Sequence, residues 1–381
     1  MNKEAAYWIA LAHLSRWGNL KINNLIIKFY YENKLSVEDF FQLTESEWEN
    51  QYGLGKKEVD DLNQAKSELA SNAFLAETLH NEGYELIPIT SHEYSKTLKE
   101  NLKASHSPVL LYVKGNKKIL REKSIAIVGS RNASDKSLEF TDNIAKIASK
   151  EFKVVVSGFA KGVDKQALDS AINYKGQSII VLPQGIMTFG YGFKKYYKQI
   201  VEGDVLVLST FFPKAPWKAE LAMARNPIIY GLADEIYVAE SSDKGGTWSG
   251  VIDGLRKNRK IFVRKPDLNE NNANNLLIQK GAIPVDFMGK ELNIIIDAHT
   301  TKNNNVIDNK SNDLQSKILA ILQKSNELTK KEIIEKLENK ISDQKFKNIM
   351  DNLENVNIIK NKKPYKYSLI EKKQVTQQSL F

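Results

Sequence analysis

Two short stretches decide the fold of this chain: IAIVGSR at residues 125–131 and VVVSGFAKGVD at residues 154–164. Each begins as a nearly continuous apolar run, which is typical of a parallel strand buried on both faces of a sheet. Each then turns through serine and glycine, and a helix is expected to begin after Gly162. A strand, a tight turn and a helix form the repeating unit of an α/β fold, so the sequence predicts that class here.

The same alternation continues along the chain. Four more short apolar runs predict strands, and five intervening segments are long enough for helices. The strands are expected at 125–129, 154–157, 179–182, 205–209, 236–239 and 261–263, and the helices at 137–150, 163–174, 193–201, 218–232 and 247–257. Six such strands with helical crossovers predict a Rossmann-like, doubly wound parallel sheet. We place this core, with its entry segment, in residues 73–298.

The regions on either side differ in texture. Residues 1–72 have apolar positions at helical spacing and predict an all-α domain, similar to a SAM or helix-hairpin-helix domain. Its Gly53-Leu54-Gly55 turn, followed by lysines, has two interpretations. It is either a helix-hairpin-helix turn whose exposed N–H groups hold a DNA phosphate, or a helix-to-helix turn that contacts nothing.

The C-terminal part predicts a separate small domain. Residues 299–312 are polar and Asn-rich, which indicates a linker. Three helices are expected at 314–322, 328–337 and 343–352, followed by a hairpin around 361–364. Three helices and a two-stranded wing predict a winged helix over 313–370, with a flexible tail at 371–381. Its lysine-rich wing indicates either contact with duplex phosphates or a solvated charge run.

Composition limits the function classes. The 381 residues contain no cysteine, which excludes disulfides, thiolate zinc sites and cysteine nucleophiles. The five histidines are scattered, so we expect no metal and no cofactor, and no apolar run approaches the roughly 20 residues that span a bilayer. We therefore expect a cytoplasmic protein with no membrane partner. The net charge of +9 favours a polyanionic partner, or reflects a merely basic surface.

Four segments carry candidate binding chemistry. Three are glycine turns that end strands or open helices, where backbone N–H groups and short side chains bind phosphate oxygens. The fourth is a helix with an Arg-Asn pair, and nearby lysines add positive charge. The candidate residues are Gly129, Ser130, Arg131, Ser157, Gly158, Lys161, Lys194, Lys195, Arg225, Asn226, Gly245, Gly246 and Thr247. All lie at strand C-terminal ends or on adjoining helices, where open sheets bind ligands.

Other residues near these turns have two interpretations. Asp164 lies in a first helical turn, where a carboxylate favours the helix dipole, and we prefer that role to a catalytic one. Phe159, Phe193 and Trp248 either stack on bases or pack in the core.

The order of these motifs resembles the DNA-processing protein A (DprA/Smf) family. The matching segments run from Pro108–Gly115 through the Gly-Ser-Arg, Ser-Gly and Arg-Asn motifs to Gly281-Ala282. The resemblance implies a non-enzymatic, dimeric binder of single-stranded DNA that loads RecA and supports natural transformation. It also implies phosphate contacts by Arg131, the Ser157-Gly158 turn, Arg225 and the Gly245–Thr247 turn. Pro227 after the Arg-Asn pair, and Arg264-Lys265-Pro266, indicate a divergent branch.

Two alternative functions use the same superfamily fold. Nucleotide phosphoribohydrolases of the "lonely guy" type carry a catalytic Glu three residues after the Gly-Gly-x-Gly-Thr turn, and that position here is Gly250. Glycine cannot stabilise an oxocarbenium-like centre or activate water, which argues against this alternative. A sensor of a free nucleotide, for instance in antiviral defence, would present the same phosphate chemistry as DNA, so the sequence leaves it open.

The last residues hold one more motif. Gln377, Leu380 and Phe381 resemble the bacterial sliding-clamp-binding peptide, in which a Leu-Phe pair fills an apolar pocket and the Gln fixes register. The alternative is a chance match of a short motif. The partners expected from the sequence are thus single-stranded DNA, RecA, a second copy of this chain and the sliding clamp.

Overall fold

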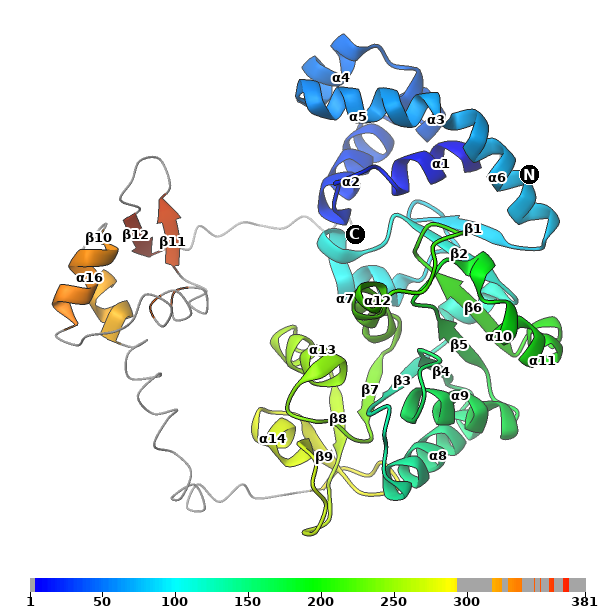
Figure 1. The fold of residues 1–381 in the computed structure, drawn as a ribbon, viewed down its shortest axis with the longest axis vertical. Coiled ribbons are helices and arrows are strands. Elements are labelled where there is room, and N and C mark those ends of the chain that lie inside the picture. Colours follow the sequence, from blue (N-terminus) through cyan, green and yellow to red (C-terminus); the bar gives the residue numbers. More distant parts are fainter. Residues whose placement is uncertain are drawn as a thin grey trace. The chain divides into compact units, whose positions relative to one another are not determined.

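The computed structural model describes residues 4–292, 317–323, 328–337, 346, 350, 356–359 and 366–369 (Figure 1). The chain divides into two compact units, one within residues 1–294 and one within 295–380. The first unit holds every strand and helix that surrounds the candidate turns.

A nine-stranded sheet forms the centre of the first unit. Its strands are β1 (Glu85–Pro88), β2 (Leu110–Lys114), β3 (Ser124–Val128), β4 (Val154–Ser157), β5 (Ser178–Val181), β6 (Val205–Ser209), β7 (Glu235–Val238), β8 (Ile261–Arg264) and β9 (Ile283–Val285). They lie in the order β1-β2-β6-β5-β4-β3-β7-β8-β9. The seven from β6 to β9 are parallel, whereas β1 and β2 extend one edge in antiparallel pairing.

The winding of the sheet changes direction next to β3. From β3 the chain steps outward through β4 and β5 to β6, and it then returns to the other side of β3 as β7, β8 and β9. The segments that leave β3 and β7 therefore part in opposite directions at the carboxyl ends of two paired strands. Such a switch point opens a crevice, which is where doubly wound sheets bind ligands.

Helices cover both faces of the sheet. On one face α8 (Asp135–Lys150) and α9 (Val163–Asn173) pack over Ile125 and Ile127. On the other, α12 (Ala219–Leu232) lies over Ala126 and Val128, α13 (Gly245–Arg256) packs against α12 and β8, and α7 (Lys96–His106) packs against α12 (Figure 1). Because successive residues of a strand point to opposite faces, the continuous apolar run of β3 contributes side chains to the hydrophobic cores on both faces of the sheet.

The predicted Rossmann-like, doubly wound core is confirmed. All six predicted strands are present within a residue of their expected bounds, and the expected crossovers are helical. The segment expected as one helix at 193–201 is instead two short helices, α10 (Gly190–Lys195) and α11 (Tyr197–Glu202). The prediction did not include β9 or the antiparallel direction of β2.

The N-terminal region is helical and shares a hydrophobic core with the sheet. Its elements are α1 (Ala5–Ala12), α2 (Asn19–Ile26), η1 (Ile27–Glu32), α3 (Val37–Gln42), α4 (Glu45–Tyr52), α5 (Lys56–Ser67) and α6 (Leu69–Asn81). At the Gly53–Gly55 turn, the Glu58 carboxylate accepts a hydrogen bond from Gly55 N at 2.5 Å and pairs with Lys21 at 2.6 Å. A carboxylate therefore occupies the helix start where a phosphate would bind, which favours the purely structural interpretation of this turn.

The second unit contains a small antiparallel sheet in the order β10-β12-β11. Its described elements are β10 (Leu328–Thr329), α16 (Lys330–Lys336), β11 (Val356–Ile359) and β12 (Lys366–Leu369), with residues 317–323 also helical. Leu328 and Thr329, expected inside a helix, form the strand β10, and Thr329 also caps the start of α16. The winged helix and the domain boundaries stay predictions, and the linker at 299–312 and the tail at 371–381 lie outside the described residues. Within the described ranges, no helix has the length and apolar character needed to span a membrane.

Candidate functional site

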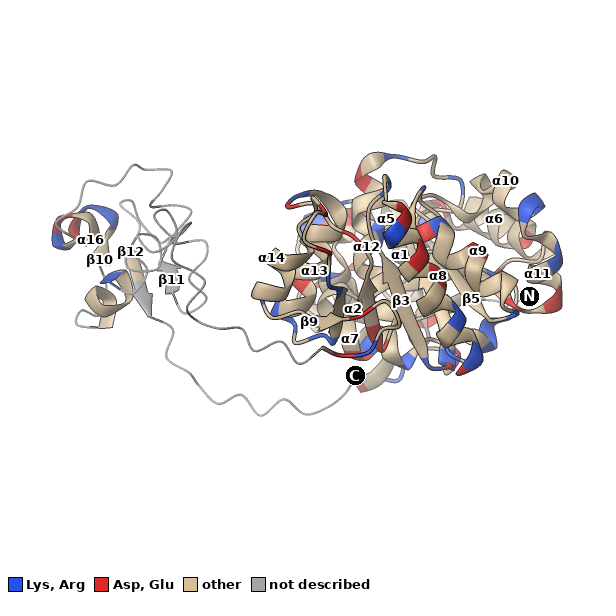
Figure 2. Ribbon diagram, turned by 90° about the horizontal axis from the view of Figure 1, so that it is seen from below, with Lys and Arg blue, Asp and Glu red and all other residues tan. Residues whose placement is uncertain are grey.

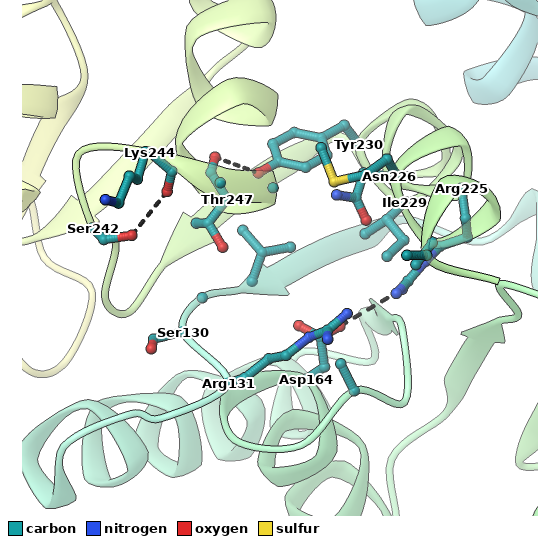
Figure 3. A pocket seen from close by; sticks show the side chains of 18 of the residues that line it. Ser130, Arg131, Asp164, Arg225, Asn226, Ile229, Tyr230, Ser242, Lys244 and Thr247 are labelled. Atoms are coloured by element: carbon teal, nitrogen blue, oxygen red, sulfur yellow. Dashed lines mark hydrogen bonds and ion pairs between the residues drawn. The ribbon is translucent and has the colours of Figure 1, made fainter.

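A cavity of about 450 Å³ opens at the switch point, between the carboxyl ends of β3 and β7. Its walls come from the turn after β3, the start of α9, the middle of α12 and the turn that opens α13 (Figure 3). Eight of the predicted binding residues line it: Gly129, Ser130, Arg131, Arg225, Asn226, Gly245, Gly246 and Thr247. The structure thus brings together three of the four predicted segments in one concave site.

The turn after β3 is held rigidly by its neighbours. Ser130 N donates a hydrogen bond to Glu240 O at 2.9 Å, and Val163 N donates to Ser130 O at 3.2 Å. These two bonds tie the turn to the end of β7 on one side and to the start of α9 on the other. Arg131 follows as an exposed side chain that reaches toward Asp164 (Figure 3). The backbone from which Arg131 extends is therefore fixed by hydrogen bonds to two neighbouring elements.

The Ser157-Gly158 turn supports the site indirectly. Ser157 is fully buried, and its hydroxyl donates to Ile127 O at 2.8 Å. The expected phosphate contact by Ser157 is therefore replaced by a bond that joins β4 to β3. Gly158 is needed for space, since a Cβ there would lie 1.3 Å from Nη1 of Arg225. The glycine leaves room for a guanidinium that comes from another helix.

Arg225 and Asp164 form a buried ion pair at the bottom of the cavity. Their Nη1 and Oδ2 atoms are 3.6 Å apart, and Arg225 is only 3% exposed. That separation is too long for a hydrogen bond. Burial lowers the pKa of Arg225 and raises the pKa of Asp164, while the opposite charge of each partner counteracts both shifts.

The pair leaves hydrogen-bonding capacity unused. In the described part of the chain, Nε and Nη1 of Arg225 are buried without a hydrogen-bond partner. Buried donors of this kind cost free energy until an acceptor reaches them, and a charged donor costs more than a neutral one. Because Arg131 places a second guanidinium close to Asp164, the two arginines outnumber the one carboxylate. The base of the cavity is therefore suited to an anion.

The opposite wall is the amino end of α13. Gly245, Gly246 and Thr247 line the cavity there, and Lys244 stands beside them as an exposed cation. No side chain caps this helix, and its first turn carries no acidic residue. Free N–H groups and the positive end of a twelve-residue helix attract phosphate.

The predicted lysines do not line this cavity. Lys161 contributes to a neighbouring hollow of about 360 Å³, which shares Arg131 with the first. Lys195 pairs with Asp169 at 2.9 Å, and Lys194 is exposed on α10. Figure 2 shows basic and acidic residues interspersed along the helices of the first unit. Within the cavity, the cationic side chains are those of Arg131, Arg225 and Lys244.

The three aromatic residues considered for stacking are partly buried and pack against other side chains. Phe159 meets Phe189 edge-on at 5.0 Å, Phe193 meets the same ring at 5.5 Å, and Trp248 packs against the large core. Trp217, which the sequence interpretation did not include, lines the cavity instead. Trp217 lies in an irregular loop before α12 and belongs to none of the predicted motifs, so the only signal for it in the sequence is that it is a tryptophan.

Gly250 lies where the phosphoribohydrolases carry their catalytic Glu. A Cβ at Gly250 would lie 2.8 Å from the ring and hydroxyl of Tyr230, whose OH donates to Thr247 O at 3.4 Å. Tyr230 fills the space that the carboxylate would need. Among the residues described, no cluster of three or more His, Asp or Glu side chains could hold a metal ion. Gln377, Leu380 and Phe381 lie outside the described residues.

Comparisons with known proteins agree with the order of the motifs. The family model for DNA recombination-mediator protein A matches residues 85–295, more than half of the chain. DNA processing protein DprA of Streptococcus pneumoniae is 33% identical over 158 residues, covering 41% of this chain and 55%, or about half, of that protein. Protein Smf of Synechocystis is 27% identical over 325 residues, covering 77% of each chain. The solved structure of the pneumococcal protein has a TM-score of 0.57 at 26% identity and covers 74% of this chain and 94% of that one.

Proposed function

This chain belongs to the DNA recombination-mediator protein A family, and from that premise we propose that it binds single-stranded DNA through the switch-point cavity. The phosphate backbone enters the cavity and crosses Arg131 into the neighbouring hollow. In this role the protein acts in recombination of DNA, including strands taken up from outside the cell.

One observation carries the proposal: the buried, incompletely bonded guanidinium of Arg225 at the base of the cavity. A phosphate oxygen supplies the acceptor that its N–H groups lack, and a charge-assisted bond of this kind is stronger than a neutral one. The amino end of α13 faces the same space and favours the same charge. These two features recognise a phosphate without reading a base, which suits a protein that takes any sequence.

The shape of the site favours a single strand over a duplex. Arg225 lies at the bottom of a cavity that holds roughly one nucleotide, with walls on several sides. A single strand can turn one phosphate inward and continue past Arg131 to Lys161, because its backbone bends freely and its bases are unpaired. A duplex would have to break its pairing to place a phosphate that deeply.

A second candidate function is the binding of a free nucleotide. The cavity volume of about 450 Å³ lies in the range of small-molecule sites, roughly 300–1,000 Å³. A mononucleotide presents the same phosphate to Arg225 and to α13. The neighbouring hollow, which holds Lys161 and shares Arg131 with the cavity, favours the longer ligand, because a mononucleotide would leave that hollow empty. Hydrolysis of such a ligand is disfavoured by Tyr230 in the place of the carboxylate.

The test is a titration of a labelled oligo-dT by fluorescence anisotropy, with unlabelled duplex, ATP, NAD and ADP-ribose as competitors. We expect the oligonucleotide to bind more tightly than the duplex and to weaken steeply with salt. Arg131→Ala should weaken binding by about 1–3 kcal/mol, the scale for one charged contact. Arg121, exposed just before β3, lies at the far end of the same strand, so Arg121→Ala is the matched control. Equal effects of the two variants, or a mononucleotide that displaces the labelled oligo-dT at concentrations comparable to that of the oligonucleotide, would reject the proposal.

Further partners are proposals from the family and from the sequence. We propose that the chain forms a homodimer, delivers RecA to the bound strand and binds the sliding clamp through Gln377, Leu380 and Phe381. The clamp contact is tested by calorimetric titration of the clamp with a peptide of residues 370–381, beside one with Leu380→Ala and Phe381→Ala. Heat of binding from the unsubstituted peptide alone supports the contact. Equal heats from the two peptides, or no heat from either, would contradict it.

A further inference from the structure

Trp217 is the most solvent-exposed tryptophan of the chain. The chain has five tryptophans, and two of them, Trp8 and Trp48, are 1% exposed. Trp17 and Trp248 are half-buried against the large core, whereas Trp217 is 53% exposed. It is also the tryptophan that lines the switch-point cavity. A single exposed apolar ring is ordinary on a protein surface, but this one also lines a cavity with three cationic side chains, where an aromatic ring is suited to contact a bound ligand.

The loop that carries this indole is anchored, while the ring is not. Ala215 N donates to Phe212 O at 2.8 Å, Gly185 N donates to Ala215 O at 2.9 Å, and Met187 N donates to Pro213 O at 3.0 Å. These bonds fix the stem of the loop between β6 and α12. Within the described part of the chain, the Trp217 ring has no aromatic partner and its Nε1 has no hydrogen bond. The ring is thus presented by a fixed stem and has a free face.

We propose that Trp217 is the base-stacking platform of the site, an inference that rests on the proposed binding of single-stranded DNA. Arg225 and the amino end of α13 hold the phosphate from within the cavity, and Trp217 stands at its margin, where the attached base has to emerge. A planar indole takes the face of any base, so the contact adds affinity without sequence preference. A base that stacks on Trp217 is not available for pairing, which gives the preference for a single strand a second cause.

Other aromatic side chains of the region cannot take this role. Phe159, Phe193 and Phe189 pack edge-on against one another, and Tyr230 is buried against Gly250. Trp217 is therefore the aromatic ring of the cavity wall with an accessible face. Lys218, the next residue, adds a cation beside it at the start of α12.

The test compares an oligo-dT with an abasic strand of the same length and charge. Each is titrated against the full-length wild type, Trp217→Leu and Trp217→Phe. We expect the wild type to prefer the dT strand and Trp217→Leu to lose roughly 5- to 150-fold in affinity for dT, the range for one stacked base. Trp217→Leu should bind the abasic strand as the wild type does, and Trp217→Phe should keep much of the preference for dT.

The matched control is Phe152→Leu. Phe152 is 89% exposed in the turn before β4, at the amino ends of the parallel strands, whereas the cavity lies at their carboxyl ends. The Phe152→Leu variant should bind the dT strand and the abasic strand with the affinities of the wild type. A folded Trp217→Leu protein that keeps the wild-type preference for dT over the abasic strand would overturn the role of Trp217 while binding stands. A wild type that binds neither strand would instead reject the proposed function.

Discussion

Gly158 is the position at which the smallest change tests the site most sharply. An added Cβ would lie 1.3 Å from Nη1 and 2.3 Å from Cζ of Arg225, far inside van der Waals contact. Arg225 is 3% exposed and cannot move aside without leaving its place next to Asp164. In Gly158→Ala the guanidinium is therefore expelled from the base of the cavity, although every charge of the protein is retained.

The size of the effect follows from what Arg225 does for the ligand. Losing one charged hydrogen bond to a phosphate costs about 1–3 kcal/mol, which is roughly a 5- to 150-fold rise in Kd. The slope of log Kd against log salt should fall by about 0.7, because one single-strand phosphate contact is lost. Anisotropy of a labelled oligo-dT at several salt concentrations measures both quantities, and thermal denaturation shows whether the variant folds.

Two further variants make the result decisive. Gly190→Ala adds the same methyl group where nothing lies within 4 Å, so it should bind like the wild type. If Gly158→Ala acts through Arg225, the double variant Gly158→Ala/Arg225→Ala should bind no more weakly than Arg225→Ala alone. Wild-type affinity of folded Gly158→Ala, or full additivity in the double variant, would refute the role assigned to Arg225.

Two more predictions concern buried ionisable groups. Asp164→Asn removes the counter-charge of buried Arg225, so we expect the free energy of unfolding to fall by about 3 kcal/mol. The same variant should bind oligo-dT severalfold more tightly, because the carboxylate no longer competes with phosphate for Arg225. Weaker binding by the folded variant would contradict this. Burial lowers the pKa of His13 from 6.5 to about 4. Between pH 6.5 and pH 4, His13 therefore takes up a proton in the unfolded chain but not in the folded protein. Stability should therefore fall as the pH falls from 6.5 toward 4, by up to about 3 kcal/mol. A Tm series should show a flatter slope for His13→Gln, and an unchanged slope would exclude His13 as its source.

Local signals explain how much of the fold could be predicted. The strands β3, β4, β5, β6 and β8 are buried on both faces, so each is a largely apolar run that can be recognised without long-range information. Strand direction is a different matter, because the apolar run of β2 looks like the others, and only its pairing with β6 makes it antiparallel. For β9, a three-residue strand, the run is too short to stand out from the chain around it.

The candidate site divides in the same way. Glycine turns at strand ends are local features that the sequence shows directly, and Gly129–Arg131 and Gly245–Thr247 line the same cavity, while their contact with phosphate stays a prediction. The roles of Ser157 and Gly158 depend on Ile127 and Arg225, which are distant along the chain, and no local pattern reports that. The positive charge of Lys195 is evident from the sequence and led to its prediction as a ligand contact. Its ion pair with Asp169 depends on the fold and is not evident from the sequence.

The carboxylates of the site bear on whether it binds or hydrolyses its ligand. Among the cavity residues that the structure describes, Asp164 is the one that carries a carboxyl group, and it is paired with Arg225. Cleavage of a glycosidic bond typically uses two carboxyl groups, one as the acid and one as the base or nucleophile. The second position is Gly250, and Tyr230 fills the space next to it, so a substitution to Glu would force that ring from its bond to Thr247. The paired arginine and carboxylate at the base of the cavity and the exposed indole in its wall are the features on which the proposed binding of a strand rests.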